Sequence, residues 1–244
     1  MRPIQRGPSP RPHDYENYQD AKPDLVSRLG PYCSFCERPV VTLLAVEHVQ
    51  PKDLPAYATL IGRWNNFLLA CVNCNSIKGI KNVVPSAILL PDRDNTFAAF
   101  AYLPNGTIAP SDLAIDSGLQ TIANRTLALT GLDKAALSTP DENGRQVALD
   151  RVSQRMEAWL TAAEANNDIQ YSPDNAKLQD YVVKLAVEKG FFSIWMTVFA
   201  GDPNMLGRFV KAFHGTSGSG CFNANGGNVT PAPNPDGLPN GGKI

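Results

Sequence analysis

Two C-x-x-C pairs constrain this chain more than any other feature of its sequence. Two residues separate Cys33 from Cys36 and Cys71 from Cys74, and 34 residues lie between the pairs. Four thiolates from two such turns suit a tetrahedral zinc ion, and a closed four-thiolate site stabilises a fold without an open position for catalysis. We therefore predict a structural Zn²⁺ with a folded segment between the pairs. A thioredoxin-like redox pair and free structural thiols are the alternatives, and no βαβ pattern supports the first.

The composition is that of a folded protein without a membrane segment. Of the 244 residues, 43% are hydrophobic and 18% are charged, and no apolar run approaches the length of a membrane span. The first residues lack the apolar core of a signal peptide, so we expect a cytoplasmic protein. The formal net charge is −1, but residues 26–93 carry seven basic and four acidic side chains, a bias compatible with phosphate contacts.

The pattern along the chain predicts an α+β fold in four parts. These are an N-terminal arm (1–25), a cysteine-containing module (26–90), a mainly helical region (91–214) and a tail rich in Gly, Asn and Pro (215–244). An apolar, β-branched run at 39–47 favours a strand, and the turn near 104–106 favours a hairpin. Helical periodicity is expected at 145–165, 175–199 and 203–213. The low apolar content of the tail predicts irregular structure, ordered against a partner.

A second group of chemistry-bearing residues lies between and beside the cysteines. Glu47 and His48 follow the apolar run, where a carboxylate can hold Mg²⁺ or Mn²⁺ and a neutral imidazole can take a proton from water. The amide of Asn66 can bond backbone groups on both sides of a loop. Asn75 follows the zinc ligand Cys74 and can offer an oxygen to a second metal. Alternatively, the asparagines serve turns and the histidine is a packed side chain.

The order of these elements resembles the HNH endonucleases of ββα-metal fold. The shared elements are C-x-x-C, E-H-x-x-P, W-x-N, C-x-x-C-N and K-G, all within residues 32–80. The resemblance implies a zinc-stapled ββα-metal module, with His48 as general base and Asn66 as a loop brace. Glu47 and Asn75 would hold the catalytic Mg²⁺ or Mn²⁺. Many relatives carry Asp or His in place of Glu47, whose extra methylene leaves open whether it binds the metal directly or through water.

The resemblance also implies a substrate and partners. The expected activity is hydrolysis of phosphodiester bonds in nucleic acid, with DNA as the expected substrate. Arg63, Lys78 and Lys81 are candidates for gripping the nucleic-acid backbone, and solubility is their alternative role. More loosely, the whole chain is similar to bacterial HNH proteins of anti-phage defence, such as Septu-type nuclease subunits, which work beside an ATPase. We also predict that the helical region binds a protein partner, such as an ATPase, or forms a homo-oligomer, because a far longer apolar-patterned region follows the module.

A non-catalytic reading stays open from the sequence. A zinc-knuckle module that only binds nucleic acid or protein would explain the four cysteines but leave Glu47, His48 and Asn75 without a role. The fifth cysteine, Cys221, is predicted to lie outside both metal sites, because the four-cysteine set is already complete.

Overall fold

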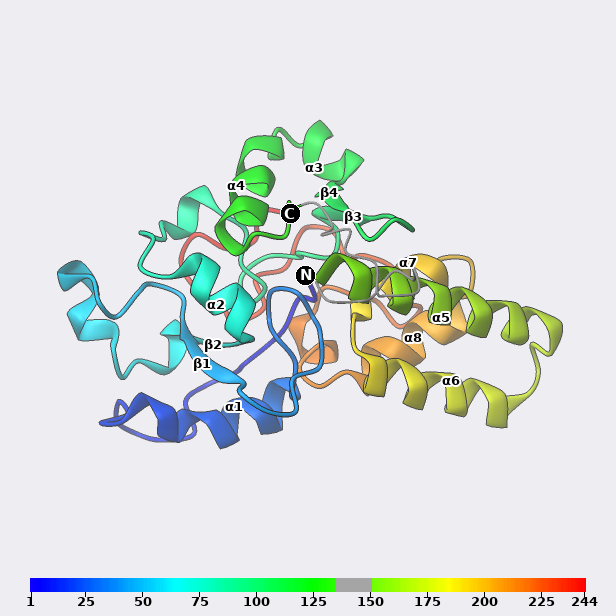
Figure 1. The fold of residues 1–244 in the computed structure, drawn as a ribbon, viewed down its shortest axis with the longest axis horizontal. Coiled ribbons are helices and arrows are strands. Elements are labelled where there is room, and N and C mark those ends of the chain that lie inside the picture. The colour runs from blue at the N-terminus through cyan, green and yellow to red at the C-terminus, as the bar shows by residue number, and fades with distance from the viewer. Residues whose placement is uncertain (135–150) are drawn as a thin grey trace, which may run out of the picture.

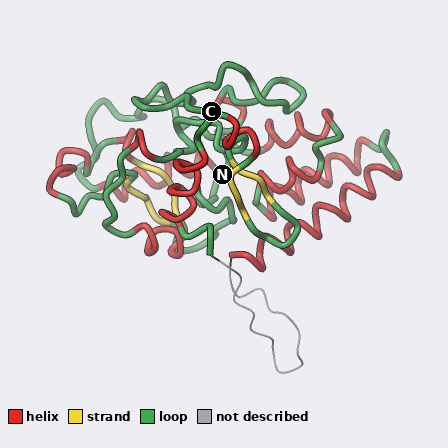
Figure 2. The backbone as a smooth tube through the Cα atoms, turned by 90° about the horizontal axis from the view of Figure 1, so that it is seen from above, coloured by secondary structure: helices red, strands yellow, loops and turns green. Residues whose placement is uncertain are grey.

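The structure is a computed structural model that describes residues 1–134 and 151–244. Helices predominate over strands, and the strands of the described residues form two separate two-stranded sheets. The predicted module lies at one end of the molecule and the long helices α5 and α6 at the other (Figure 1). Figure 2 shows the same division from above, with loops covering the middle.

The module is built on one antiparallel strand pair followed by a helix. β1 (Ala45–His48) pairs with β2 (Phe67–Ala70) so that His48 lies opposite Phe67. All four residues of β2 are buried, which explains their uninterrupted apolar sequence. Helix α2 (Val72–Lys78) follows β2 directly and packs against β1, while α1 (Lys22–Leu29) packs against β2. The 3-10 helices of this end are η1 (Tyr18–Ala21), η2 (Pro55–Leu60), η3 (Trp64–Asn66) and η4 (Pro85–Ala87).

The predicted strand at 39–47 exists only at its end. Ala45 pairs with Ala70, the last residue of β2, and the chain then turns through Cys71 into α2. Before Ala45, Pro39 forms only an isolated bridge to Tyr32, and the chain then runs through a loop in which Val41 is 94% exposed and Leu43 is 78% exposed. Apolar, β-branched composition alone does not make a strand when no neighbouring strand can pair with it.

The helical region begins with a hairpin, as the turn signal predicts. β3 (Phe100–Tyr102) pairs with β4 (Ile108–Pro110). The helices are α3 (Asp112–Asp116), α4 (Gln120–Thr130), α5 (Arg151–Tyr171), α6 (Ala176–Lys189), α7 (Phe192–Val198) and α8 (Pro203–Ala212), with a last 3-10 helix, η5 (Ser217–Ser219). Gly190, with a φ of 71°, ends α6 and separates it from α7. The start of the predicted helix at 145–165 lies outside the described residues. Among the helices described, none combines the length and apolar character needed to cross a membrane.

The two terminal segments run through the middle of the molecule, where both chain ends lie (Figure 1). Ile4 in the arm is 1% exposed, and the buried Arg6 pairs with Asp92 at 2.8 Å. The tail is irregular, as its composition predicts, and it is ordered by contacts with other segments of the same chain. The backbone N–H of Asn95 donates to the carbonyl of Ile244. One hydrophobic core thus includes residues of the arm, the module, the helical region and the tail.

Candidate functional site

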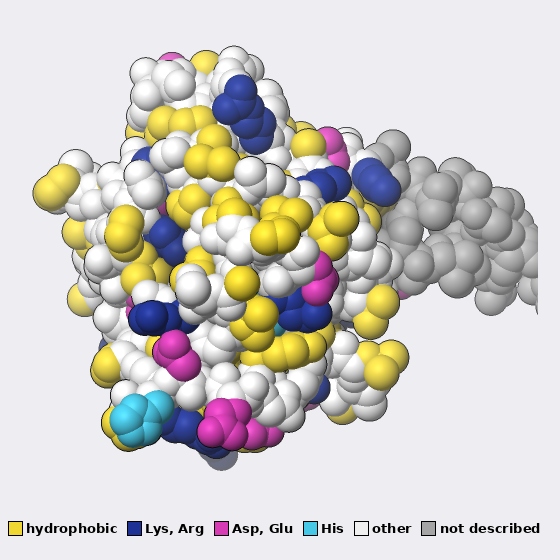
Figure 3. All heavy atoms as spheres, turned by 90° about the vertical axis from the view of Figure 1, so that its left-hand side faces the viewer, with side chains coloured by type: hydrophobic (Ala, Val, Ile, Leu, Met, Phe, Trp, Pro, Cys, Tyr) yellow, Lys and Arg dark blue, Asp and Glu magenta, His cyan; other side chains and the backbone are white. Residues whose placement is uncertain are grey.

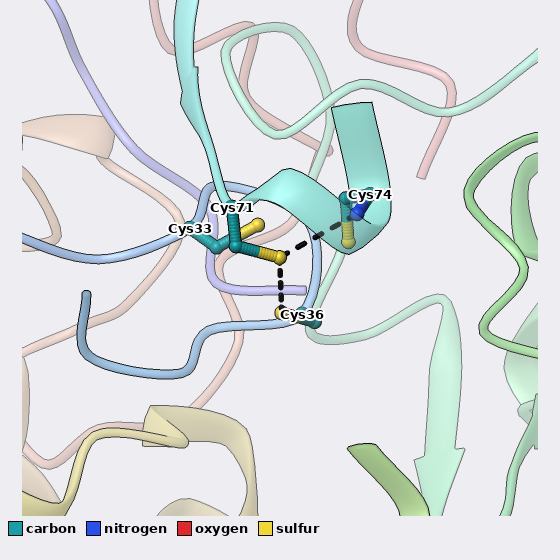
Figure 4. Close-up of side chains that lie close together, drawn as sticks. All are labelled: Cys33, Cys36, Cys71 and Cys74. Carbon is teal, nitrogen blue, oxygen red and sulfur yellow. Dashed lines mark hydrogen bonds between the residues drawn. The ribbon is translucent and has the colours of Figure 1, made fainter. Parts of the chain in front are cut away.

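Four buried cysteine sulfurs converge where β2 turns into α2 (Figure 4). Cys33 and Cys36 come from the loop after α1, Cys71 caps the N-terminus of α2, and Cys74 lies in its first turn. The ligand sulfurs all lie within 4.8 Å of one another, and the Cys36 and Cys71 sulfurs are 3.7 Å apart. Tetrahedral zinc with Zn–S bonds of about 2.3 Å places sulfurs about 3.8 Å apart. The donor set and spacing fit zinc, so the predicted clustering of these cysteines is confirmed.

The cysteine cluster (Cys33, Cys36, Cys71 and Cys74) favours the thiolate unevenly among its members. Hydrogen bonds from Cys33, then Cys36 and Cys74, lower the pKa of the Cys71 thiol, whereas hydrogen bonds with the other thiols raise the pKa of Cys36 and of Cys74. The guanidinium of Arg151, at the start of α5, donates to the Cys74 sulfur at 3.1 Å and to the carbonyl of Thr130 at 2.9 Å. This cation offsets the negative charge of the thiolates and ties the helical region to the cluster. Cys221 lies apart, with its thiol directed at the Ser219 carbonyl.

His48 ends β1 and is held on several sides. Its Nε2 lies 2.9 Å from the carbonyl oxygen of Ile61. Because a carbonyl can only accept, Nε2 carries the proton and Nδ1 keeps its lone pair. The imidazole packs edge-on against Tyr18 and Phe67, with ring centroids 4.7 and 5.2 Å away. Burial lowers the pKa of His48, so the ring is a neutral, oriented base near pH 7.

Asn66 ties together the loop between β1 and β2. Its buried Oδ1 accepts the backbone N–H of Gln50 at 2.8 Å. Its Nδ2 donates to the carbonyl of Gln50 at 3.0 Å and to that of Leu60 at 3.3 Å. These bonds join the first and last parts of the loop, whose end carries the Ile61 carbonyl that holds His48. The amide thus bonds backbone on both sides of a loop, as a bracing asparagine would.

Glu47 precedes His48 and is buried against a lysine of α2. The Lys78 ammonium lies 2.7 Å from the Glu47 Oε1 and donates to the His48 carbonyl at 2.7 Å. Burial raises the pKa of Glu47, and the positive charge of Lys78 opposes that shift. Lys78 was expected to reach outward toward phosphate, but its side chain is only 2% exposed. The packing of α2 against β1 directs the Lys78 ammonium toward Glu47 and away from solvent.

One small pocket, with a volume of 130 Å³, collects several of these side chains. Glu47, His48, Asn75 and Lys78 line it, and Tyr18 and Gln19 of the arm form part of its wall. We call this cavity the His48 pocket. Two other candidates lie outside it. Arg63 is half-exposed and pairs with Asp14 at 3.0 Å, and Lys81 is exposed beyond the end of α2.

The donors of the His48 pocket suit a hard divalent cation. A carboxylate from Glu47 and an amide oxygen from Asn75 match the oxygen preference of Mg²⁺ and Mn²⁺. Within the described ranges, the cysteine cluster is the only group of three or more His, Cys, Asp or Glu side chains placed to share a metal. The protein therefore offers few ligands at the His48 pocket, and a cation there would complete its shell with water or substrate oxygens.

Two residues of the His48 pocket, Lys78 and Tyr18, have roles that sequence reasoning missed. The position of Lys78 has a signal in the sequence, because it follows Cys74 by four residues and so shares its helix face. Tyr18 has no such signal, since it reaches His48 from the arm through a tertiary contact.

Comparison with protein-family models, curated proteins and solved structures gives no match to this chain.

Proposed function

We propose that this chain is a metal-dependent endonuclease of the HNH, ββα-metal type, and that it hydrolyses phosphodiester bonds in DNA. The strand pair β1–β2 and the following α2 bring Glu47, His48 and Asn75 to one pocket. The observation that carries the proposal is the state of His48, since its Nε2 bonds the Ile61 carbonyl and its Nδ1 keeps a lone pair. The same pocket carries the Glu47 carboxylate and the Asn75 amide, which are the oxygen donors that a metal-dependent hydrolysis would need beside the base.

The residues divide the proposed reaction between them. His48 takes a proton from the attacking water at Nδ1, and the Ile61 carbonyl stabilises the positive ring that results. Glu47 and Asn75 would hold Mg²⁺ or Mn²⁺, which when bound supplies positive charge to the phosphate and to the leaving oxygen. Asn66 keeps the loop, and with it the Ile61 carbonyl, in register with His48.

Accessible cations near the pocket could contact a polyanionic substrate. Figure 3 views the end of the molecule that carries the module, and Lys and Arg side chains are distributed across it among apolar ones, with Asp and Glu side chains also present. Lys52 lines the His48 pocket with its side chain 37% exposed, and Arg63 and Lys81 are also accessible. Contacts from such side chains to phosphate contribute affinity and carry no sequence information.

Cleavage of plasmid DNA tests the proposal. With Mg²⁺ or Mn²⁺ the wild-type protein should nick or cut the plasmid, and His48→Ala should lower the rate by roughly two to four orders of magnitude. Zinc content and thermal stability are measured on both proteins, and His13→Ala, at an exposed histidine, is the matched control.

A His48→Ala protein that cuts at the wild-type rate would remove His48 from the reaction. A wild-type protein that binds DNA but never cleaves it would favour the non-catalytic zinc-knuckle reading instead.

A further inference from the structure

Lys78 is a buried cation that links two elements of the site. It lies in the last turn of α2, one turn after Asn75, and its side chain is 2% exposed. Lysine is rarely buried to this extent unless it is paired. Its ammonium reaches β1, where the Glu47 carboxylate and the His48 carbonyl each lie 2.7 Å away.

We infer that Lys78 is a positioning residue that holds the two proposed metal ligands, Glu47 and Asn75, at a fixed distance and angle. The inference rests on the proposed function. Glu47 belongs to β1 and Asn75 to α2, so their relative placement depends on how the helix packs on the strand. Metal ligands must be held within about 0.5 Å of their working geometry, which packing alone does not ensure. Lys78 joins the helix to the strand within one turn of Asn75.

The bond to the His48 carbonyl ties Lys78 to the backbone of β1 as well as to a side chain. A carboxylate that binds a divalent ion can turn away from an ammonium, so the Glu47 pair alone would not fix the strand. The His48 carbonyl belongs to the backbone, and a bond to it holds the strand whichever way the Glu47 side chain turns. The carbonyl and the imidazole belong to the same residue, so Lys78 also restrains the position of the proposed base.

The burial of Lys78 argues against a direct contact with phosphate. Two of its three ammonium protons already have acceptors, and the chain leaves almost none of the side chain accessible. Lys81 offers the natural comparison, because it is the same residue type three positions later and is exposed. A phosphate contact would be expected from Lys81, and a positioning role from Lys78.

Three full-length variants separate these roles, namely Lys78→Met, Lys78→Arg and Lys81→Met. Binding of Mn²⁺ without nucleic acid is measured by the loss of the free Mn²⁺ paramagnetic resonance signal. The Mn²⁺ concentration for half-maximal plasmid cleavage and the affinity for duplex DNA without added Mn²⁺ are measured alongside. Zinc content and the melting curve report whether each variant folds.

Lys78→Met should weaken Mn²⁺ binding and raise the Mn²⁺ requirement by about 10- to 100-fold, the usual cost of losing a group that orients a metal ligand. DNA affinity should stay within about twofold of wild type, since no phosphate contact is lost. Lys78→Arg keeps the charge in an altered geometry and should give an intermediate defect. Lys81→Met should lower DNA affinity and leave the Mn²⁺ requirement unchanged.

Two results would overturn the inference while leaving the proposed function standing. One is wild-type Mn²⁺ binding in Lys78→Met, and the other is a loss of DNA affinity in that variant with an unchanged Mn²⁺ requirement. If Lys78→Met does not fold, the test rests on Lys78→Arg. A wild-type Mn²⁺ requirement in Lys78→Arg would then contradict the positioning role of Lys78. Absence of cleavage by the wild-type protein would instead refute the endonuclease proposal itself.

Discussion

Replacing Asn66 with alanine tests whether the loop brace supports both the fold and the reaction. The side chain makes three hydrogen bonds, two of them to the backbone of Gln50 and one to the carbonyl of Leu60. At about 1 kcal/mol for each bond, their loss lowers the free energy of unfolding by about 3 kcal/mol. In a protein of this size, that change lowers the melting temperature by roughly 6–12 °C.

The effect on cleavage should exceed what lost stability explains. Asn66 joins the two ends of the loop that carries the Ile61 carbonyl, and this carbonyl fixes the ring of His48. A displacement of about 1 Å at a reacting group can lower a rate by about 100-fold. We therefore expect Asn66→Ala to cleave plasmid DNA about 10- to 100-fold more slowly, even at a temperature where it is fully folded.

Thermal denaturation and single-turnover cleavage measure the two effects. Asn65→Ala is the matched control, because Asn65 is the adjacent residue of the same type and is exposed. It should melt and cut like the wild-type protein. An Asn66→Ala protein with wild-type melting temperature and rate would refute the reasoning, since a buried amide that bonds three backbone groups cannot be lost without effect if the geometry is as described.

Two further predictions concern the cysteine cluster and pH. Elemental analysis of protein purified without added zinc should find about one zinc per chain. Cys71→Ser should lose the zinc and unfold the module, because structural zinc contributes on the order of 10 kcal/mol to folding. Cys221→Ser should keep the zinc. Wild-type protein that is metal-free and folded would contradict this. Burial lowers the pKa of His48 below its ordinary value of 6.5, so its stabilising contribution is present above pH 6.5 and lost as pH falls through the folded-state pKa. Cleavage should fall over the same acidic range, and a profile in which wild type loses activity only above pH 6.5 would rule out His48 as the base.

Much of the site can be predicted from the sequence because its chemistry is local. The C-x-x-C spacing determines that each pair supplies two adjacent sulfurs, and one metal-sized cluster is the simplest way to use four of them. Cys74 and Asn75 are consecutive, so the turn that places the sulfur also places the amide. Glu47 and His48 likewise follow from the end of one strand. Neighbours in sequence stay neighbours in space, and such positions need no knowledge of the tertiary fold.

The features that could not be predicted depend on contacts between distant segments. Tyr18 belongs to an arm whose composition says nothing of His48, yet the two rings are 4.7 Å apart. The apolar run at 39–47 favours a strand by composition, but β2 ends at Ala70 and leaves most of it without a partner. Sequence patterns predict local conformation, whereas a partner strand or a docking surface is a property of the folded chain.

The distribution of these contacts shows why the chemistry of the module depends on the rest of the chain. The arm supplies Tyr18 to the wall of the His48 pocket, and the helical region supplies Arg151 to the Cys74 sulfur at 3.1 Å. A zinc ion held by four thiolates carries a net charge of about −2, which is costly to bury without a compensating donor. The guanidinium of Arg151 supplies that donor and also bonds the carbonyls of Thr130 and Gly131 at the end of α4. A charge placed to stabilise a bound zinc ion therefore also joins α4 and α5 to the cysteine cluster, and disturbance of these helices would reach that cluster through Arg151.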